Sequence, residues 1–286
     1  MLIPPRWLLN IFVGLVMISI GLRVRRADFF NILRNRGLLG RSLLANCVLV
    51  PAFGFLLTRL VPLDASGKIG ILLLAAVPGT PVALQFTRTA RNRLAFVATL
   101  AFILSMSAVV IAPVAVQLVP HQQSQYRPTE DLILSLLVQI VFPLGLGALL
   151  ARLWPAAAPA LGKWLDILAT VVFLFLMWET RGIRREAFRS LEGRLIGAMV
   201  ALLIAGMTIG WWLGGPDRES RRVMATSTSM RNVVVTFFVA RYWFPDTQVY
   251  FVPIAYLGMM VPANLIFTLV EKLLQRKSTA ERALAK

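Results

Sequence analysis

The stretch Ala225-Thr226-Ser227-Thr228-Ser229-Met230-Arg231-Asn232 places four hydroxyl residues and an arginine inside a segment that is otherwise apolar enough to cross a bilayer. It is followed by Val233-Val234-Val235-Thr236-Phe237-Phe238-Val239, which hydropathy assigns to the hydrocarbon. An arginine near the middle of a spanning helix costs about 2.5–3.5 kcal/mol on insertion scales, and residues of this kind usually have a function. Arg231 therefore predicts a functional centre inside the membrane.

The composition of the whole chain is that of a membrane protein. Of its 286 residues, 58% are hydrophobic and 15% are charged, whereas soluble domains are about 45–50% apolar and about 25% charged. A spanning helix needs about 20 mostly apolar residues, and this length predicts an all-α polytopic membrane protein with about nine transmembrane helices. Together they form a single transmembrane domain over residues 1–286, and their expected limits are 5–23, 40–62, 67–89, 93–119, 130–153, 160–180, 194–214, 219–243 and 248–274.

The basic residues follow the loops between these spans. The net charge of +17 would favour a nucleic-acid partner in a soluble chain, but lysine and arginine gather here as the positive-inside rule expects, so we expect the lipid bilayer and no nucleic acid as partner. In alternate loops, 19 basic residues fall on one side and 10 on the other, and Arg231 completes the 30. This count predicts a protein of the plasma (inner) membrane with its N-terminus outside and its C-terminus in the cytoplasm. The basic loop 181–194, on the outer side, argues against this topology.

The residues that build metal, redox and catalytic sites are scarce. Cys47 is the one cysteine and His121 the one histidine, so a disulfide within the chain and a cysteine or histidine metal cluster are excluded. The spans contain no serine–histidine or paired-aspartate arrangement, and no G-x-x-x-x-G-K-[ST] loop for ATP is present. We therefore expect neither an enzyme nor a resident metal or cofactor.

The third span is interrupted by Pro78-Gly79-Thr80-Pro81. Two prolines and a glycine remove amide donors and permit non-helical backbone. In hydrocarbon, the freed backbone groups need partners in the protein or in a watery cavity. Two interpretations remain: a proline kink packed by neighbouring helices, or a discontinuous helix whose new N-terminus points at a ligand.

The interruption at Pro78 and the polar run at Ser227 lie about half a chain length apart. If the first half lacks one leading helix, they are equivalent positions of an inverted repeat, with repeat one at about 5–119 and repeat two at about 130–274. Polar or broken helices at matching positions of two repeats indicate the substrate site of a secondary transporter.

At these stretches, and along nearly its whole length, the sequence resembles the bile acid:sodium symporter family. Gly21-Leu22 with Asp28-Phe29 is similar to the first-loop signature, and Ala45-Asn46-Cys47 with Pro51 to the Ala-Gln-Phe…Pro helix. Pro78-Gly79 with Thr87 and Ala90-Arg91 resembles the family's broken helix, and Met230-Arg231-Asn232 its Gly-Met-Gln-Asn-Ser run. The resemblance implies a panel of spans 1, 5 and 6 and a core of spans 2–4 and 7–9. In that core two discontinuous helices cross.

By the same resemblance, the residues that build the family's two sodium sites are mostly replaced. The family's glutamate falls on Ser227 and its glutamine on Arg231, while its remaining ligands fall on Asn46, Ala83, Leu84, Val97 and Ala101. Only Ser227 and Asn46 could still offer a side-chain oxygen, and a hard cation needs several, normally with a carboxylate among them. Our hypothesis is that Arg231 replaces the bound cation and donates to carbonyls freed at the helix breaks.

Other interpretations of these residues remain open. Arg231 could pair with Glu179 or extend to the interface, and the absence of glycine and proline from 217 to 244 leaves a continuous eighth helix possible. Asp166 and Glu179 are candidate proton carriers near the ends of the sixth span. The candidate substrate-binding residues are Pro78, Gly79, Thr80, Gln85, Ser229, Arg231, Asn232 and Asn264.

The function that this pattern favours is sodium-independent transport of an organic anion by alternating access. The positive ends of two half-helices, together with Arg231, favour a carboxylate or sulfonate. Two alternatives remain: sodium symport that uses backbone carbonyls and the surviving hydroxyls, and a non-transporting membrane sensor or scaffold.

Overall fold

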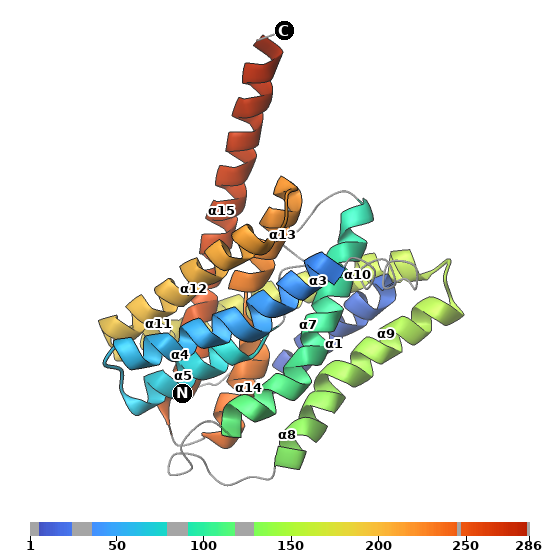
Figure 1. The fold of residues 1–286 in the computed structure, drawn as a ribbon. Coiled ribbons are helices and arrows are strands. Elements are labelled where there is room, and N and C mark those ends of the chain that lie inside the picture. Colours follow the sequence, from blue (N-terminus) through green and yellow to red (C-terminus); the bar gives the residue numbers. More distant parts are fainter. Residues whose placement is uncertain (1–5, 25–35, 79–90, 118–128, 245–246, 285–286) are drawn as a thin grey trace.

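The computed structural model describes residues 6–24, 36–78, 91–117, 129–244 and 247–284, and in these ranges the chain consists of helices and the turns between them (Figure 1). Seven helices in the described ranges are long and apolar enough to cross a membrane. Two shorter apolar helices, Trp7–Arg23 and Ala65–Ala76, accompany them. An all-α polytopic membrane protein is thereby confirmed, while the count of nine spans stays a prediction.

The spans of the first half begin with α1. The second span is made of three consecutive pieces, and the third is short. Their bounds are α1 Arg6–Arg23, α3 Arg36–Leu43, the π-helical turn η1 Leu44–Leu49, α4 Val50–Leu60, α5 Ala65–Ala76 and α7 Arg91–Gln117.

The second half follows with a fifth span that is again built from three pieces. Its elements are α8 Thr129–Leu136, the π-helical turn η3 Leu137–Val141, α9 Phe142–Leu153, α10 Ala158–Glu179 and α11 Arg181–Ser190. The chain continues with α12 Gly193–Leu213, α13 Arg218–Ser229, α14 Val233–Trp243, the 3-10 turn η4 Gln248–Tyr250 and α15 Phe251–Leu284.

Each of the two π-helical turns lies directly before a proline. The amide of Val50 donates to the carbonyl of Ala45, five residues earlier, and Pro51 follows at once. Phe142 donates to Leu137 in the same way in front of Pro143. A proline has no N–H and its ring crowds the carbonyl four residues back, so a wider turn removes the clash.

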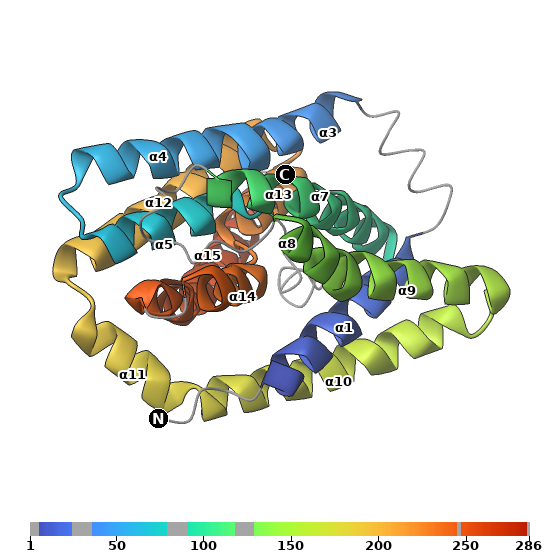
Figure 2. The same cartoon turned by 90° about the horizontal axis from the view of Figure 1, so that it is seen from below.

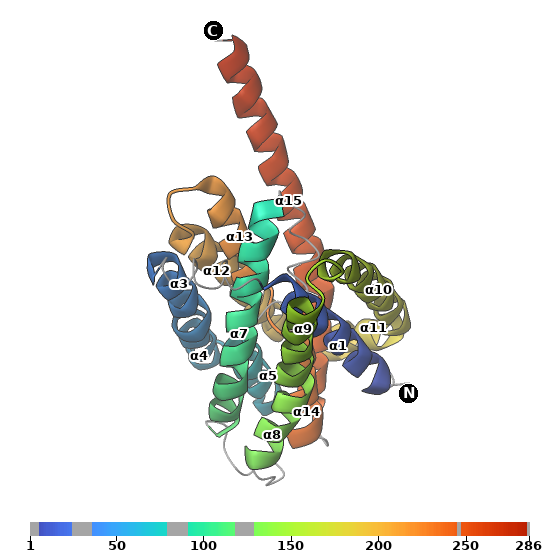
Figure 3. The ribbon, with the colours of Figure 1, turned by 90° about the vertical axis from the view of Figure 1, so that its right-hand side faces the viewer.

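The helices form two groups that Figure 2 separates clearly. In one group, α1 packs along both α9 and α10. In the other, α12 packs along α13 and α4, while α5 lies against α4, α7, α14 and α15. Helix α11 runs from the end of α10 to the start of α12 (Figure 2), and the C-terminal part of α15 projects beyond the other helices (Figures 1 and 3).

The contact between α1 and α9 depends on two facing glycines. A Cβ atom on Gly21 would meet the backbone carbonyl of Leu144, and one on Gly147 would meet that of Ile18. The two backbones therefore approach as closely as only glycine allows, in the way small residues bring helices together in membranes.

The stretch 181–194, which we expected to be a loop, is largely helix α11, so that expectation was wrong. Ala187 is buried and α11 packs on α15, while Arg185 and Arg189 are exposed. Arg184 donates to the carbonyl of Met177 and to the hydroxyl of Thr180, both at 2.6 Å, which ties α11 to the end of α10. A helix this short and this basic does not have the apolar length by which spans are recognised in a sequence.

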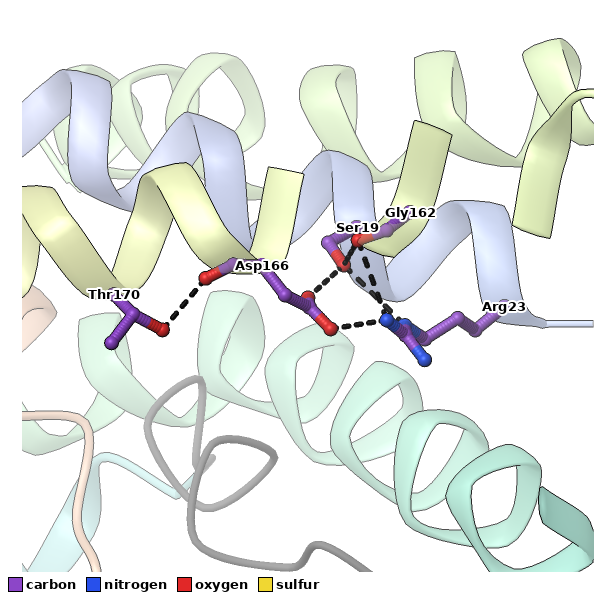
Figure 4. Close-up of polar contacts among 5 residues, drawn as sticks. All are labelled: Ser19, Arg23, Gly162, Asp166 and Thr170. Carbon is purple, nitrogen blue, oxygen red and sulfur yellow. Dashed lines mark hydrogen bonds and ion pairs between the residues drawn. The ribbon is translucent and has the colours of Figure 1, made fainter. Parts of the chain in front are cut away.

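A polar cluster joins α1 to α10 (Figure 4). Arg23 forms an ion pair with Asp166 and donates to the carbonyl of Gly162 at 3.3 Å. Ser19 donates to the same carboxylate. The side chains of Arg23 and Asp166 are 21% and 36% exposed. Asp166, one of our candidate proton carriers, is therefore the partner of an arginine within this helix group.

We expect the Asp166→Asn substitution to lower the thermal stability of the protein. The loss of a partly exposed ion pair costs about 1 kcal/mol, which corresponds to a fall in Tm of about 2–4 °C. The measurement is thermal unfolding of the purified protein in detergent. The exchanged pair Arg23→Asp with Asp166→Arg is the control and should recover part of the loss, whereas an unchanged Tm in Asp166→Asn would show that the pair contributes nothing.

Candidate functional site

The eighth span is broken in the middle. Helix α13 ends at Ser229 and α14 begins at Val233, and the backbone between them is extended at Met230, with a ψ of 102°. The hydroxyl run 226–229 is itself helical, so the break falls just after it. The interpretation of a continuous eighth helix is therefore wrong.

Side chains and amides close the two new helix ends. The amide of Met230 donates to the carbonyl of Thr226. The side-chain oxygen of Asn232 accepts from the amide of Val235 at 3.2 Å and so caps the N-terminus of α14. The Nδ2 atom of Asn232 is buried and has no hydrogen-bond acceptor among the described residues.

Arg231 lies between these helix ends and is 1% exposed. Its Nε donates to the carbonyl of Leu74 at 3.0 Å. Its Nη1 donates to Oδ1 of Asn46 at 3.2 Å, and its Nη2 donates to the carbonyls of Asn46, at 3.3 Å, and of Ala75. Four oxygens from α5 and η1 thus surround one guanidinium.

These oxygens are available because helical hydrogen bonding fails at their positions. In a continuous helix the carbonyl of Leu74 would accept from residue 78, which is a proline without an N–H. In the π-helical turn the carbonyl of Asn46 would accept from residue 51, which is also a proline. Helix α5 ends at Ala76, one residue after Ala75. A buried carbonyl without a donor is costly, and Arg231 supplies the missing donors.

The observed contacts exclude both alternative placements of Arg231. Its hydrogen bonds go to the four oxygens rather than to Glu179, and its burial is incompatible with extension to the interface. The only carboxylate on either broken span is that of Glu219 in the first turn of α13, since the sequence contains no aspartate or glutamate from 65 to 129 or from 220 to 245. The positive charge of Arg231 is therefore surrounded by neutral oxygens.

A second set of contacts joins the end of α13 to α15. The hydroxyl of Tyr256 donates to the carbonyl of Ser229 at 2.7 Å, and the hydroxyl of Ser229 donates to Oδ1 of Asn264 at 3.1 Å. Asn264 in turn donates to the carbonyl of Met260 at 2.9 Å. Our sequence reasoning missed Tyr256, because a tyrosine in an apolar span gives no signal of its own.

The structure brings part of the expected site together. Asn46, Ser229, Arg231, Asn232 and Asn264 are buried around the second break, and Pro78 is buried directly after α5. Ser227 is buried on α13 and its hydroxyl donates to the carbonyl of Met224 at 3.2 Å. Ala101 is buried on α7; Val97 lies on the same helix, but its side chain is not described. Outside the described residues are Gly79, Thr80, Ala83, Leu84 and Gln85.

The oxygens around Arg231 do not fit a sodium ion in addition to the guanidinium. Oδ1 and the carbonyl of Asn46 already accept from the guanidinium, as do the carbonyls of Leu74 and Ala75. A second cation at these oxygens would lie beside a fixed positive charge, and the four oxygens themselves are neutral.

Two neighbouring cavities lie between α1 and α14. One is apolar, has a volume of about 50 Å³ and includes Phe12, Phe173 and Val233 in its lining. The other has a volume of about 380 Å³ and is lined in part by the polar side chains of Asn10, Ser135, Gln139 and Arg241. Both cavities share Leu9, Val234 and Phe237, so they adjoin along the same face of α14.

A known protein family matches part of this chain. The sequence profile described as "Sodium Bile acid symporter family" matches residues 10–186, more than half of the chain. The chain belongs to the sodium bile acid symporter family. The broken eighth span lies beyond the matched range.

Two curated relatives are similar to this family member over most of its length. The "Probable sodium/metabolite cotransporter BASS2, chloroplastic" of Oryza sativa subsp. japonica is 22% identical over 245 residues, which are 85% of this chain and 58% of the relative. The "Uncharacterized sodium-dependent transporter YocS" of Bacillus subtilis (strain 168) is 22% identical over 231 residues, 78% of this chain and 70% of the relative. The chain thus spans little more than half the length of the rice protein, and both relatives are named for sodium.

Proposed function

We propose that this protein is a secondary transporter that moves an organic anion by alternating access without sodium, with Arg231 in place of the bound cation. Family membership and the names of the two relatives support transport. The observation that carries the sodium-independent part is the set of four oxygens that accept from the Arg231 guanidinium. A covalently attached cation does not dissociate between the two states of a transporter, so no co-transported ion is needed to hold the two breaks together.

The groups at the same helix break support a negatively charged substrate. The guanidinium of Arg231 and the N-terminus of α14 both favour a negative group nearby. Asn232 caps that N-terminus and has a buried Nδ2 donor without an acceptor among the described residues. A carboxylate or sulfonate provides acceptor oxygens for such a donor. We therefore assign an organic anion as the substrate class.

Movement of two helix groups against each other would give such a substrate alternating access. The proposed panel is spans 1, 5 and 6, which are α1, α8–α9 with η3, and α10. The proposed core is spans 2–4 and 7–9, which are α3–α4 with η1, α5, α7 and α12–α15. The two cavities between α1 and α14 lie between these groups. Rocking of rigid helix groups around a site near the membrane midplane is a common transport mechanism in carriers built from repeats.

Uptake into proteoliposomes tests the proposal. The purified full chain is reconstituted, and uptake of radiolabelled cholate and benzoate is measured with sodium and with choline as the only external cation. We expect uptake above that of protein-free liposomes, with rates in sodium and choline that agree within about twofold, because no sodium site is left to fill. Uptake that requires a sodium gradient would support ordinary symport, and no flux of either anion would support a sensor or scaffold; both results would contradict the proposal.

A further inference from the structure

Arg231, which we expected to bind substrate, has one N–H left for the substrate's anion. A guanidinium has five N–H donors, and four hydrogen bonds to protein oxygens are already present. A bidentate contact with a carboxylate or sulfonate uses two donors, so it needs a different positive side chain.

Arg241 is an arginine in the lining of the larger of the two cavities between α1 and α14. Two amide side chains share that lining, Asn10 from α1 and Gln139 from η3, together with the hydroxyl of Ser135. The Arg241 guanidinium also lies 5.5 Å from the centre of the Tyr250 ring, a contact that restrains its position. A volume of about 380 Å³ falls within the range of about 300–1,000 Å³ of small-molecule sites.

This cavity lies close to one surface of the membrane. Asn10 is in the first turns of α1, which begins at Arg6, and Ser135 is near the start of the span that begins at Thr129. Arg241 is in the last turn of α14, which ends at Trp243. Nine residues separate it from Asn232 at the other end of the helix, about 13 Å at the rise of an α-helix. Arg241 therefore lies at the opposite end of α14 from the break, and the cavity extends along the helix from Arg241 to Val234, two residues from Asn232.

We infer that this cavity is an anion-capture site, in which Arg241 binds the carboxylate or sulfonate of the substrate before it reaches the break at Arg231. The inference rests on the proposed transport function and adds a second site to it. Arginine provides a bidentate donor pair for such groups, and the amides of Asn10 and Gln139 add neutral donors. The adjoining apolar cavity, with Phe12 and Phe173, provides a surface for the apolar part of an amphipathic anion.

The test compares Arg241→Gln with Arg59→Gln in the full chain. Arg59 is a matched control, because it is also an arginine in the last turn of a spanning helix and also contacts an aromatic ring, that of Phe55 at 5.0 Å, yet lines neither cavity. Binding of the choline salts of cholate and benzoate to the detergent-solubilised protein is measured by calorimetry, with benzamide as the uncharged comparison. The KM and the maximal rate of uptake are measured separately in proteoliposomes.

We expect Arg241→Gln to weaken binding of both anions about tenfold or more and to raise KM by a similar factor, with the maximal rate little changed and benzamide unaffected. Arg59→Gln should match the unsubstituted protein, and Arg241→Lys should fall between. Equal affinities in Arg241→Gln and Arg59→Gln, or no binding of either anion to the unsubstituted protein, would overturn the inference. Sodium-independent uptake with an unchanged KM in Arg241→Gln would refute this site alone, whereas binding that depends on Arg241 without any flux would refute the transport function alone.

Discussion

Replacing Arg231 by alanine is expected to abolish transport and to destabilise the fold more than any other single substitution of a charged residue considered above. The change removes the donors of the carbonyls of Leu74, Ala75 and Asn46 and of the Asn46 side chain. Each neutral buried oxygen left without a donor costs about 1–3 kcal/mol. We expect the Tm in detergent to fall by about 10 °C and uptake to fall to the level of empty liposomes.

The Arg231→Lys substitution tests whether the positive charge is enough or whether the donor geometry of the guanidinium is also required. Its ammonium keeps the positive charge but is a compact group on a flexible stem, so it cannot reach oxygens from α5 and η1 with the fork of a guanidinium. Arg231→Lys should therefore be intermediate in both Tm and uptake. Arg222→Ala is the control on the same helix, because Arg222 is partly exposed on α13 and the described structure shows no contact between it and the break.

Unchanged transport in variants of Arg231 would contradict its role in place of a cation. If Arg231→Ala or Arg231→Gln transported cholate or benzoate at the unsubstituted rate and with the same response to sodium, the guanidinium would not stand in for a cation. A large fall in Tm with unchanged transport would assign Arg231 a purely structural role.

Replacing Gly147 by alanine is the second substitution with a large expected effect. The added Cβ would overlap the backbone carbonyl of Ile18 on α1. Backbone atoms cannot rotate away as a side chain can, so α1 and α9 must separate or bend, at a cost of about 3 kcal/mol, the upper part of the range for overpacking. We expect a marked loss of folded protein in fluorescence-detected size-exclusion chromatography and a fall in Tm of about 6–12 °C.

The control for this substitution lies two residues earlier on the same helix. A Cβ atom on Gly145 meets nothing within 4 Å, so Gly145→Ala should be neutral or slightly stabilising because alanine favours a helix over glycine. The reciprocal variant Gly21→Ala should resemble Gly147→Ala. The double variant should lose less stability than the two single variants added together, since both changes disrupt the same close contact. Equal Tm values for Gly147→Ala and Gly145→Ala would contradict the close approach of α1 and α9.

The sequence predicted the class of the protein because class depends on local composition. Long apolar runs and few charges specify spanning helices wherever their neighbours lie. The proline at 78 likewise predicted an interrupted third span, since a missing N–H acts within its own turn. The arginine at 231 was recognisable because a charge in hydrocarbon is costly in every tertiary arrangement.

The exact break in the eighth span could not be predicted in the same way. The residues Met230–Asn232 contain neither glycine nor proline, and the hydroxyl run that drew attention remained helical. The chain leaves the helical conformation there because Arg231 must reach acceptors on α5 and η1 and because Asn232 caps the next helix. Helix α11 was missed for a related reason, since its packing on α15 rather than its own hydropathy identifies it.

The sequence by itself determined that this chain lies in a membrane as a bundle of helices, that Pro78 cannot donate an N–H within its span, and that a buried arginine needs partners. The tertiary structure alone decided who those partners are, because Asn46 is 185 residues from Arg231 along the chain. It also decided that Tyr256 closes the end of α13 and that Arg241 lines a cavity with Asn10 and Gln139. The physical reason is that composition and hydrogen-bond loss act within a turn of helix, whereas the groups that satisfy a buried charge come from wherever packing places them.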